Sequence, residues 1–129
     1  MNTLRIQLAE ARDGFRPRES LRGTAEWQLG RAPAAVEVRL CWFSDVQGVA
    51  EVRRVQTVRQ DRPQASGRCE FDFRLPDGPY SYAGSLAKLG WAVELVALPE
   101  LDFSQVFFNF GPAAEVVELQ RQLKSAGSE

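Results

Sequence analysis

The stretch FDFRLPDGPYSYAGSLAKLGWAV, from Phe71 to Val93, decides the fold class of this chain. It begins with alternating apolar and polar residues that end at Leu75-Pro76, passes through a turn rich in glycine and proline, and resumes as an extended segment carrying Trp91. Such alternation is typical of a strand with one face on a core and the other toward solvent. The stretch therefore predicts two antiparallel strands of a β-sandwich.

The same pattern extends outward along most of the chain. Extended segments are expected at residues 4–8, 21–29, 36–43, 69–75, 86–97 and 102–110, with a loop at 61–67. Residues 49–58 place a valine at every third position, which favours a strand with a bulge near Arg53-Arg54. Gly90 is expected to mark a bend in its strand. Strands separated by turn signals, without a helical period before residue 112, predict an all-β antiparallel sandwich.

After Pro112 the periodicity becomes helical. Val116, Leu119 and Leu123 follow helical spacing, and acidic residues precede basic ones, as the helix dipole favours. We expect residues 1–112 to form one sandwich domain. Residues 113–129 are expected to form a short C-terminal helix, over about 113–124, and a tail.

Composition argues against two classes of partner. The 16 basic and 17 acidic side chains give a net charge of −1 and are spread over alternating strands, so we expect no nucleic-acid partner. The longest uncharged run, residues 103–114, is too short for a membrane span. Charged residues interrupt the N-terminus before an apolar signal segment forms, so the expected location is cytoplasmic.

The two cysteines, Cys41 and Cys69, are predicted to be free thiols. In residues 36–42 the apolar side chains occupy the even positions, so Cys41 falls on the opposite face of its strand. In residues 69–73 the apolar side chains occupy the odd positions, and Cys69 shares their face. The two sulfur atoms should therefore point apart and form no disulfide. Free thiols are the usual state inside a cell.

The inventory of reactive side chains argues against catalysis. The chain has no histidine, which is the commonest general base and metal ligand. Two cysteines far apart in the chain do not make a zinc site. Glu70 and Asp72 share one strand face, but acidic side chains on the polar face of a sandwich are ordinarily solvated. We expect no enzymatic activity, cofactor or metal, unless a partner chain supplies the missing histidine or metal.

Apolar residues on both faces of a strand indicate that something covers its outer face. Cys41 and Phe43 lie opposite the core positions of their strand, and the adjacent Phe107 and Phe108 must point to opposite faces of theirs. These four residues form a candidate interaction surface. The cover is the expected C-terminal helix, a second copy of the chain, or a protein partner.

Beyond these patterns, the chain resembles arrestin-fold domains. The resemblance rests on four matches in order: FRPRESLRG at residues 15–23, FxFxLP at 71–76, PYSY at 79–82 followed by Gly84, and LGWAVE at 89–94. In arrestin domains the glycine of the first match begins the second strand, as Gly23 would here. A generic immunoglobulin-like sandwich stays an alternative, but a true immunoglobulin domain places its tryptophan between two bridged cysteines, whereas Trp42 directly follows Cys41.

The resemblance implies protein–protein scaffolding, the role of arrestins, the arrestin-like retromer subunit and bacterial sporulation-control proteins of similar fold. Those proteins pair two sandwich domains, whereas this chain has length for one, and no residue pattern here matches their polar-core or lipid sites. The expected function is a non-catalytic adaptor or scaffold module that meets a protein partner, or a second copy, at a strand edge or apolar face. The alternative is a small-ligand or carbohydrate-binding sandwich with Tyr80, Tyr82 and Trp91 as an aromatic platform.

Overall fold

Two antiparallel sheets lie face to face in the computed structural model of the chain, which describes residues 2–12, 14–99 and 102–112. The strands are β1 (Thr3–Leu8), β2 (Ser20–Gln28), β3 (Ala35–Val46), β4 (Val49–Asp61), β5 (Ser66–Arg74), β6 (Tyr82–Ala83), β7 (Ala87–Leu98) and β8 (Asp102–Phe108). The three-stranded sheet has the order β1-β2-β5. The five-stranded sheet has the order β4-β3-β7, and both β6 and β8 pair with the other edge of β7.

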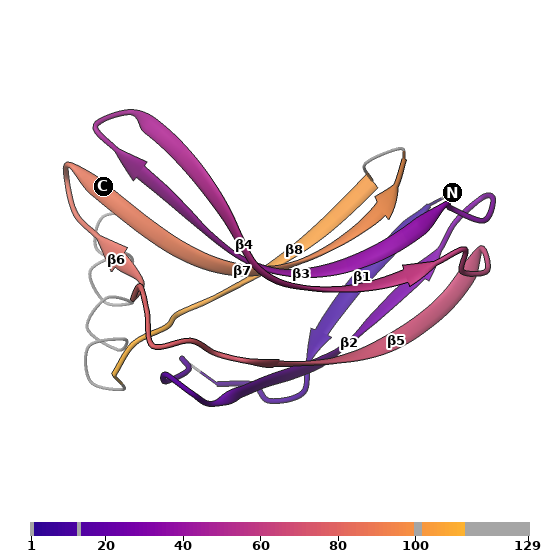
Figure 1. Ribbon diagram of the computed structural model, residues 1–129, viewed down its shortest axis with the longest axis horizontal. Coiled ribbons are helices and arrows are strands. Elements are labelled where there is room, and N and C mark those ends of the chain that lie inside the picture. The colour runs from indigo at the N-terminus through magenta and orange to yellow at the C-terminus, as the bar shows by residue number, and fades with distance from the viewer. Residues whose placement is uncertain (1, 13, 100–101, 113–129) are drawn as a thin grey trace.

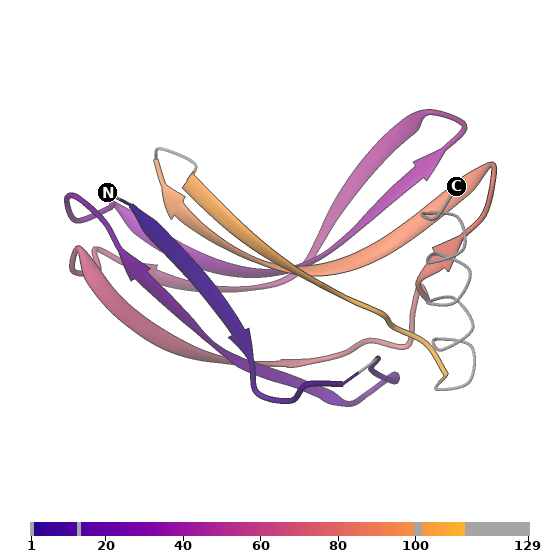
Figure 2. The same cartoon turned by 180° about the vertical axis from the view of Figure 1, so that it is seen from behind.

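The five-stranded sheet is strongly curled. Figures 1 and 2 show its middle lying over the β1-β2-β5 sheet, while the β3–β4 hairpin and the neighbouring end of β7 rise away from the sandwich. A register shift between Leu40 and Cys41 leaves Val55 of β4 without a partner on β3. A bulge of this kind increases local twist and bends the strand. Figures 1 and 2 show that the outer face of this sheet is concave.

The all-β prediction is confirmed, and each segment predicted from alternation forms a strand. The valine-rich segment is the single strand β4, and its bulge lies one residue beyond the predicted Arg53-Arg54. The predicted 61–67 loop is shorter than expected, because β4 runs to Asp61 and β5 begins at Ser66. Pairing between β3 and β7 continues through Gly90 without a register shift, and the bend expected there stays a prediction. The predicted C-terminal helix lies outside the described residues. Over the ranges that are described, no helix has the length and apolar character needed to cross a membrane.

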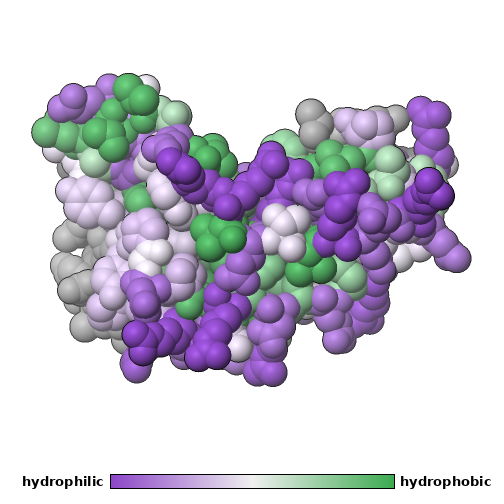
Figure 3. Space-filling model, in the orientation of Figure 1, coloured by the Kyte–Doolittle hydropathy of each residue, from purple (hydrophilic) through white to green (hydrophobic). Residues whose placement is uncertain are grey.

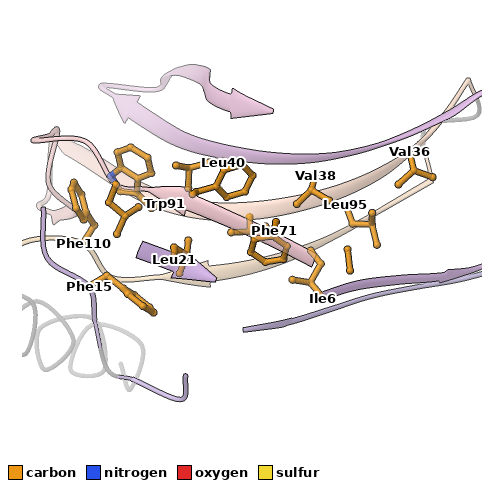
Figure 4. Packing of buried hydrophobic residues seen from close by; sticks show 14 of the residues in the cluster. Ile6, Phe15, Leu21, Val36, Val38, Leu40, Phe71, Trp91, Leu95 and Phe110 are labelled. Atoms are coloured by element: carbon orange, nitrogen blue, oxygen red, sulfur yellow. The ribbon is translucent and has the colours of Figure 1, made fainter. Parts of the chain in front are cut away.

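The core fills the space between the two sheets (Figure 4). Its buried residues are Ile6, Phe15, Leu21, Ala25, Trp27, Val36, Val38, Leu40, Phe71, Phe73, Leu75, Trp91, Val93, Leu95 and Phe110. Trp91 lies at one end of this cluster, and its ring meets that of Phe110 edge to face at 5.1 Å. Its indole N–H donates a hydrogen bond of 2.7 Å to the carbonyl oxygen of Pro79, so the polar edge of this buried ring is satisfied.

Gly23 lies on β2, the central strand of the three-stranded sheet, in register with Leu8 at the end of β1 and with Phe71 on β5. A Cβ atom at this position would lie 2.5 Å from the backbone oxygen of Gln7 and 2.5 Å from Cζ of Phe71. The Phe71 ring therefore occupies the space where another residue would carry its side chain. This close approach explains why the second strand carries glycine here.

Segments far apart in the sequence close one end of the sandwich. The N–H of Phe15 donates to the carbonyl oxygen of Asn109 at 2.9 Å, and the N–H of Gly111 donates to the carbonyl oxygen of Phe15 at 3.0 Å. Ser81 holds Phe110 from the other side, since its hydroxyl accepts from the N–H of Phe110 at 2.9 Å and its own N–H donates to the Phe110 carbonyl at 2.8 Å. The FRPRESLRG and PYSY segments thus meet through the chain that follows β8.

Candidate interaction surface

Two of the four predicted surface residues meet on the outer face of the five-stranded sheet. Phe43 of β3 and Phe107 of β8 belong to strands separated by β7, yet their ring centroids are 6.1 Å apart. Between them β7 presents Gly90, in register with Phe43, and Ala92, in register with Phe107. Because neither residue carries a large side chain, the two rings lean together over β7. We call Phe43 and Phe107 the phenylalanine pair, and Phe107 is 65% exposed.

The other two predicted surface residues are not exposed on this face. Phe108 points inward, as alternation along β8 requires, and packs between Phe15 and Trp91 at centroid distances of 5.6 and 6.1 Å. Cys41 does lie on the outer face but is fully buried, and its thiol contacts the side chain of Glu94, a same-face neighbour on β7. The predicted surface is therefore corrected to the phenylalanine pair. The C-terminal helix that was expected as its cover lies outside the described residues.

The Cys41 thiol donates a hydrogen bond of 3.2 Å to Oε1 of Glu94, and Oε2 of Glu94 accepts one of 3.3 Å from the side-chain amide of Gln105. Burial, followed by the nearby carboxylate, raises the pKa of Cys41 to about 12. Cys69 is half-buried, and its pKa is also raised by burial. Both cysteines are free, as predicted.

We expect Cys41 to resist alkylation in the folded protein. At about pH 8 a thiol with this pKa is ionised to only about one part in ten thousand, and the thiolate is the reactive form. A Cys69→Ser variant, which retains only Cys41, should therefore react with a thiol reagent only after denaturation. A Cys41→Ser variant should react slowly in the folded state through Cys69. Rapid labelling of the Cys69→Ser variant without denaturant would contradict the burial of Cys41.

Charged residues on the same outer face, beyond the bulge, are paired with one another. Oε1 of Glu37 lies 2.8 Å from the guanidinium of Arg39, which is only 8% exposed, and Oε2 of Glu37 lies 2.6 Å from Arg59. Arg59 also contacts Asp61 at 2.7 Å. Burial alone would raise the pKa of Glu37, but hydrogen bonds from Arg39 and Arg59 outweigh it and lower that pKa. This part of the face is therefore an internally neutralised network, and the phenylalanine pair is its apolar neighbour.

A pocket of about 360 Å³ opens beside the phenylalanine pair. It forms where β6 and β8 share one edge of β7, since β6 pairs only as far as Leu89 and β8 begins its pairing at Trp91. Gly90 lies between these two pairings, and a Cβ added there would meet nothing within 4 Å. The lining residues are Ser81, Tyr82, Ala83, Lys88, Leu89, Gly90, Trp91, Phe107, Phe108 and Asn109. Phe107 thus borders both the pocket and the outer face.

Sequence reasoning did not find this pocket. Its shape depends on two short segments meeting the same edge of β7 end to end, and no local pattern in either segment carries that information. The only available signal was Gly90, a glycine inside an otherwise apolar strand, which can mark a place where a partner approaches closely.

The aromatic platform of the alternative function is not formed. Trp91 is fully buried, and Phe108 and Phe110 pack against its ring. Tyr80 packs edge to face on Phe110 at 5.7 Å and is 41% exposed, while Tyr82 is 54% exposed. A ring that is enclosed in the core cannot stack on a sugar, so the three aromatic side chains do not act together.

Comparison with solved structures identifies the architecture. The chain is similar to the crystal structure of Spo0M, a sporulation control protein from Bacillus subtilis, with a TM-score of 0.59 and 13% sequence identity. The two share a fold. The similarity covers 86% of this chain and 49% of Spo0M, so the chain spans about half the length of that protein. No family model matches the sequence, and no match was found among curated proteins. The resemblance to sporulation-control proteins is thereby supported at the level of the fold.

Proposed function

We propose that this chain is a non-catalytic, arrestin-like interaction module, located in the cytoplasm, that binds a protein partner through the phenylalanine pair and the adjoining pocket. The observation that carries the proposal is the exposure of Phe107 at the rim of a pocket, against a second aromatic ring on the solvent side of the sheet. Aromatic side chains are enriched in the centres of protein interfaces, where a few of them supply most of the binding energy.

The chemistry of the surface indicates what the partner presents. The pocket is lined mainly by apolar groups, with Ser81, Lys88 and Asn109 among its polar residues. A partner would place an apolar side chain in the pocket and cover the exposed face of Phe107. The fold shared with Spo0M agrees with a module of this type by analogy, but one fold hosts many functions, so the proposal rests on the surface itself.

The test is affinity capture with two matched variants of β8. Phe103 and Phe107 lie on the same face of this strand and are 60% and 65% exposed, but only Phe107 adjoins Phe43 and the pocket. We expect Phe107→Glu to lose the captured partner and Phe103→Glu to retain it. Burying a carboxylate in an apolar contact should weaken binding by about thirtyfold or more, measured by calorimetry with the identified partner.

Two results would overturn the proposal. Equal capture by both variants would place the contact elsewhere on the molecule. A small molecule that raises the melting temperature of the wild type at saturation but not that of Phe107→Glu, with no captured protein, would make the pocket a ligand site instead. Circular dichroism on both variants establishes beforehand that they are folded.

A further inference from the structure

The free edge of β4 is the longest unpaired strand edge in the described residues. β4 has 13 residues and pairs only with β3, so its other side presents backbone N–H and C=O groups without strand partners. The bulge at Val55 divides it into two parts. Beyond the bulge, the side-chain amide of Gln56 donates to the carbonyl oxygen of Arg74 at 2.7 Å and draws β4 toward β5. Before the bulge, residues 49–54 rise with the hairpin, clear of the sandwich (Figure 1).

An apolar row crosses the sheet and ends at this edge. Val52 is directly in register with Phe43, so the two side chains share the outer face, and Phe43 in turn meets Phe107 over β7. Val52 is 55% exposed. Figure 3 shows hydrophobic side chains gathered at the raised end of the β3–β4 hairpin. The row therefore stops at the point where a further strand would continue it.

Opposite charges flank Val52 on the other face of the strand. Glu51 and Arg53 form an ion pair of 2.9 Å within β4, with their side chains 50% and 65% exposed. An exposed pair of this kind contributes little stability, so either partner can exchange for another at small cost. Along β4 the order is Glu51, Val52, Arg53. An antiparallel second copy presents the reverse order, so each acidic residue would face a basic one.

We propose that a second copy of this chain pairs with residues 50–54 of β4, antiparallel, with Val52 opposite Val52 of the second copy. Glu51 then lies opposite Arg53 of the second copy, and the symmetry repeats this ion pair. Arg54 lies opposite Ala50 of the second copy, in the same cross-strand row as that copy's Asp45, which is in register with Ala50. The apolar rows of the two copies join into one that runs from Phe107 to Phe107 across a continuous sheet.

The charges select this register. A shift that centres the pairing on Glu51 places two carboxylates directly opposite each other, and a shift to Arg53 places two guanidinium groups there. Like charges in directly opposed positions are destabilising. Of these three registers, the one centred on Val52 gives two attractive Glu51–Arg53 pairs and an apolar contact between the two valines. The inference goes beyond the proposed function, because it needs only the β4 edge, whereas Phe107 lies on the far side of β7.

Charge reversal tests the register in solution. Wild-type protein should show a concentration-dependent monomer–dimer equilibrium in sedimentation velocity at physiological ionic strength. In Glu51→Arg, arginine faces arginine at both of the symmetric 51–53 positions. In Arg53→Glu, carboxylate faces carboxylate at the same positions. Each variant should therefore dimerise about tenfold more weakly or not at all. An equimolar mixture of the two variants should dimerise again, because every opposed pair is then attractive. The double variant Glu51→Arg/Arg53→Glu should also form dimers.

The matched control is Gln60→Glu, which adds a negative charge to the same strand beyond the bulge and should leave the dimer unchanged. Wild type that stays monomeric at every concentration would overturn the proposal. Dimers that persist in both single variants, or a mixture that fails to restore them, would overturn the register. Phe107→Glu should still dimerise. A failure of the proposed dimer can therefore be distinguished from a failure of the proposed partner site at the phenylalanine pair. Melting curves verify that each variant is folded.

Discussion

Trp91→Ala is expected to lower the free energy of unfolding by about 4 kcal/mol. The side chain is fully buried, and its removal leaves a cavity between Phe108 and Phe110 at one end of the core. The substitution also leaves the carbonyl oxygen of Pro79 without the 2.7 Å hydrogen bond from the indole N–H. Since a domain is typically stable by 5–15 kcal/mol, about 4 kcal/mol is a large share of the total.

Urea titration followed by circular dichroism measures this loss. Trp42→Ala is the matched control, because Trp42 is directly in register with Trp91 on β3 but is only partly buried. We expect it to cost roughly half as much. Trp91→Phe keeps an aromatic ring and should recover most of the stability, with a remaining loss of about 1–2 kcal/mol for the smaller ring and the missing hydrogen bond. Equal losses for Trp91→Ala and Trp42→Ala would contradict the placement of Trp91 in the core.

Gly23→Ala is expected to destabilise the protein by about 3 kcal/mol although it adds a single methyl group. The added Cβ would lie 2.5 Å from the backbone oxygen of Gln7, on the adjacent strand, and 2.5 Å from the Phe71 ring. The ring can be displaced only at the expense of the core, and the backbone oxygen only by parting β1 from β2. For a domain of this size such a loss lowers the melting temperature by about 10 °C.

Gly90→Ala is the matched control, since it adds the same methyl group to a strand where nothing lies within 4 Å. Replacing glycine by alanine in a strand favours folding slightly when space allows, so the melting temperature of Gly90→Ala should stay within about 2 °C of wild type. Scanning calorimetry on both variants makes the comparison. Equal melting temperatures for the two variants would show that β1 and β2 leave room for a side chain at Gly23.

Alternation along single strands predicted the parts of the fold that depend on local sequence. The opposite orientations of Phe107 and Phe108 follow from a period of two residues, and so does the separation of Cys41 from Cys69. The bulge in β4 was detectable because a valine at every third position does not fit an unbroken strand. In each case the alternation of side chains along a single strand was enough, because it determines which face of the sheet each side chain occupies.

Features that depend on neighbouring strands escaped prediction. Alternation places Cys41 on the outer face, but its burial beside Glu94 depends on the register that brings β7 next to β3. The contact between Phe43 and Phe107 requires β7 between them, with small residues at Gly90 and Ala92. The register of a sheet joins residues that are distant in the chain, and a single sequence does not state that register.

The central position of β7 has a consequence for how the protein is made. β7 pairs with β3 on one side and with β6 and β8 on the other, yet only β8 follows it among the described strands. On the ribosome, β1, β2 and β5 can pair as soon as Arg74 has emerged, whereas β3 keeps one edge open until Leu98 has emerged. During that interval the nascent chain exposes the unpaired backbone N–H and C=O groups of β3, and the core lacks Trp91, Val93 and Leu95 of β7. Chaperone demand during synthesis should therefore peak between the emergence of β5 and that of β7.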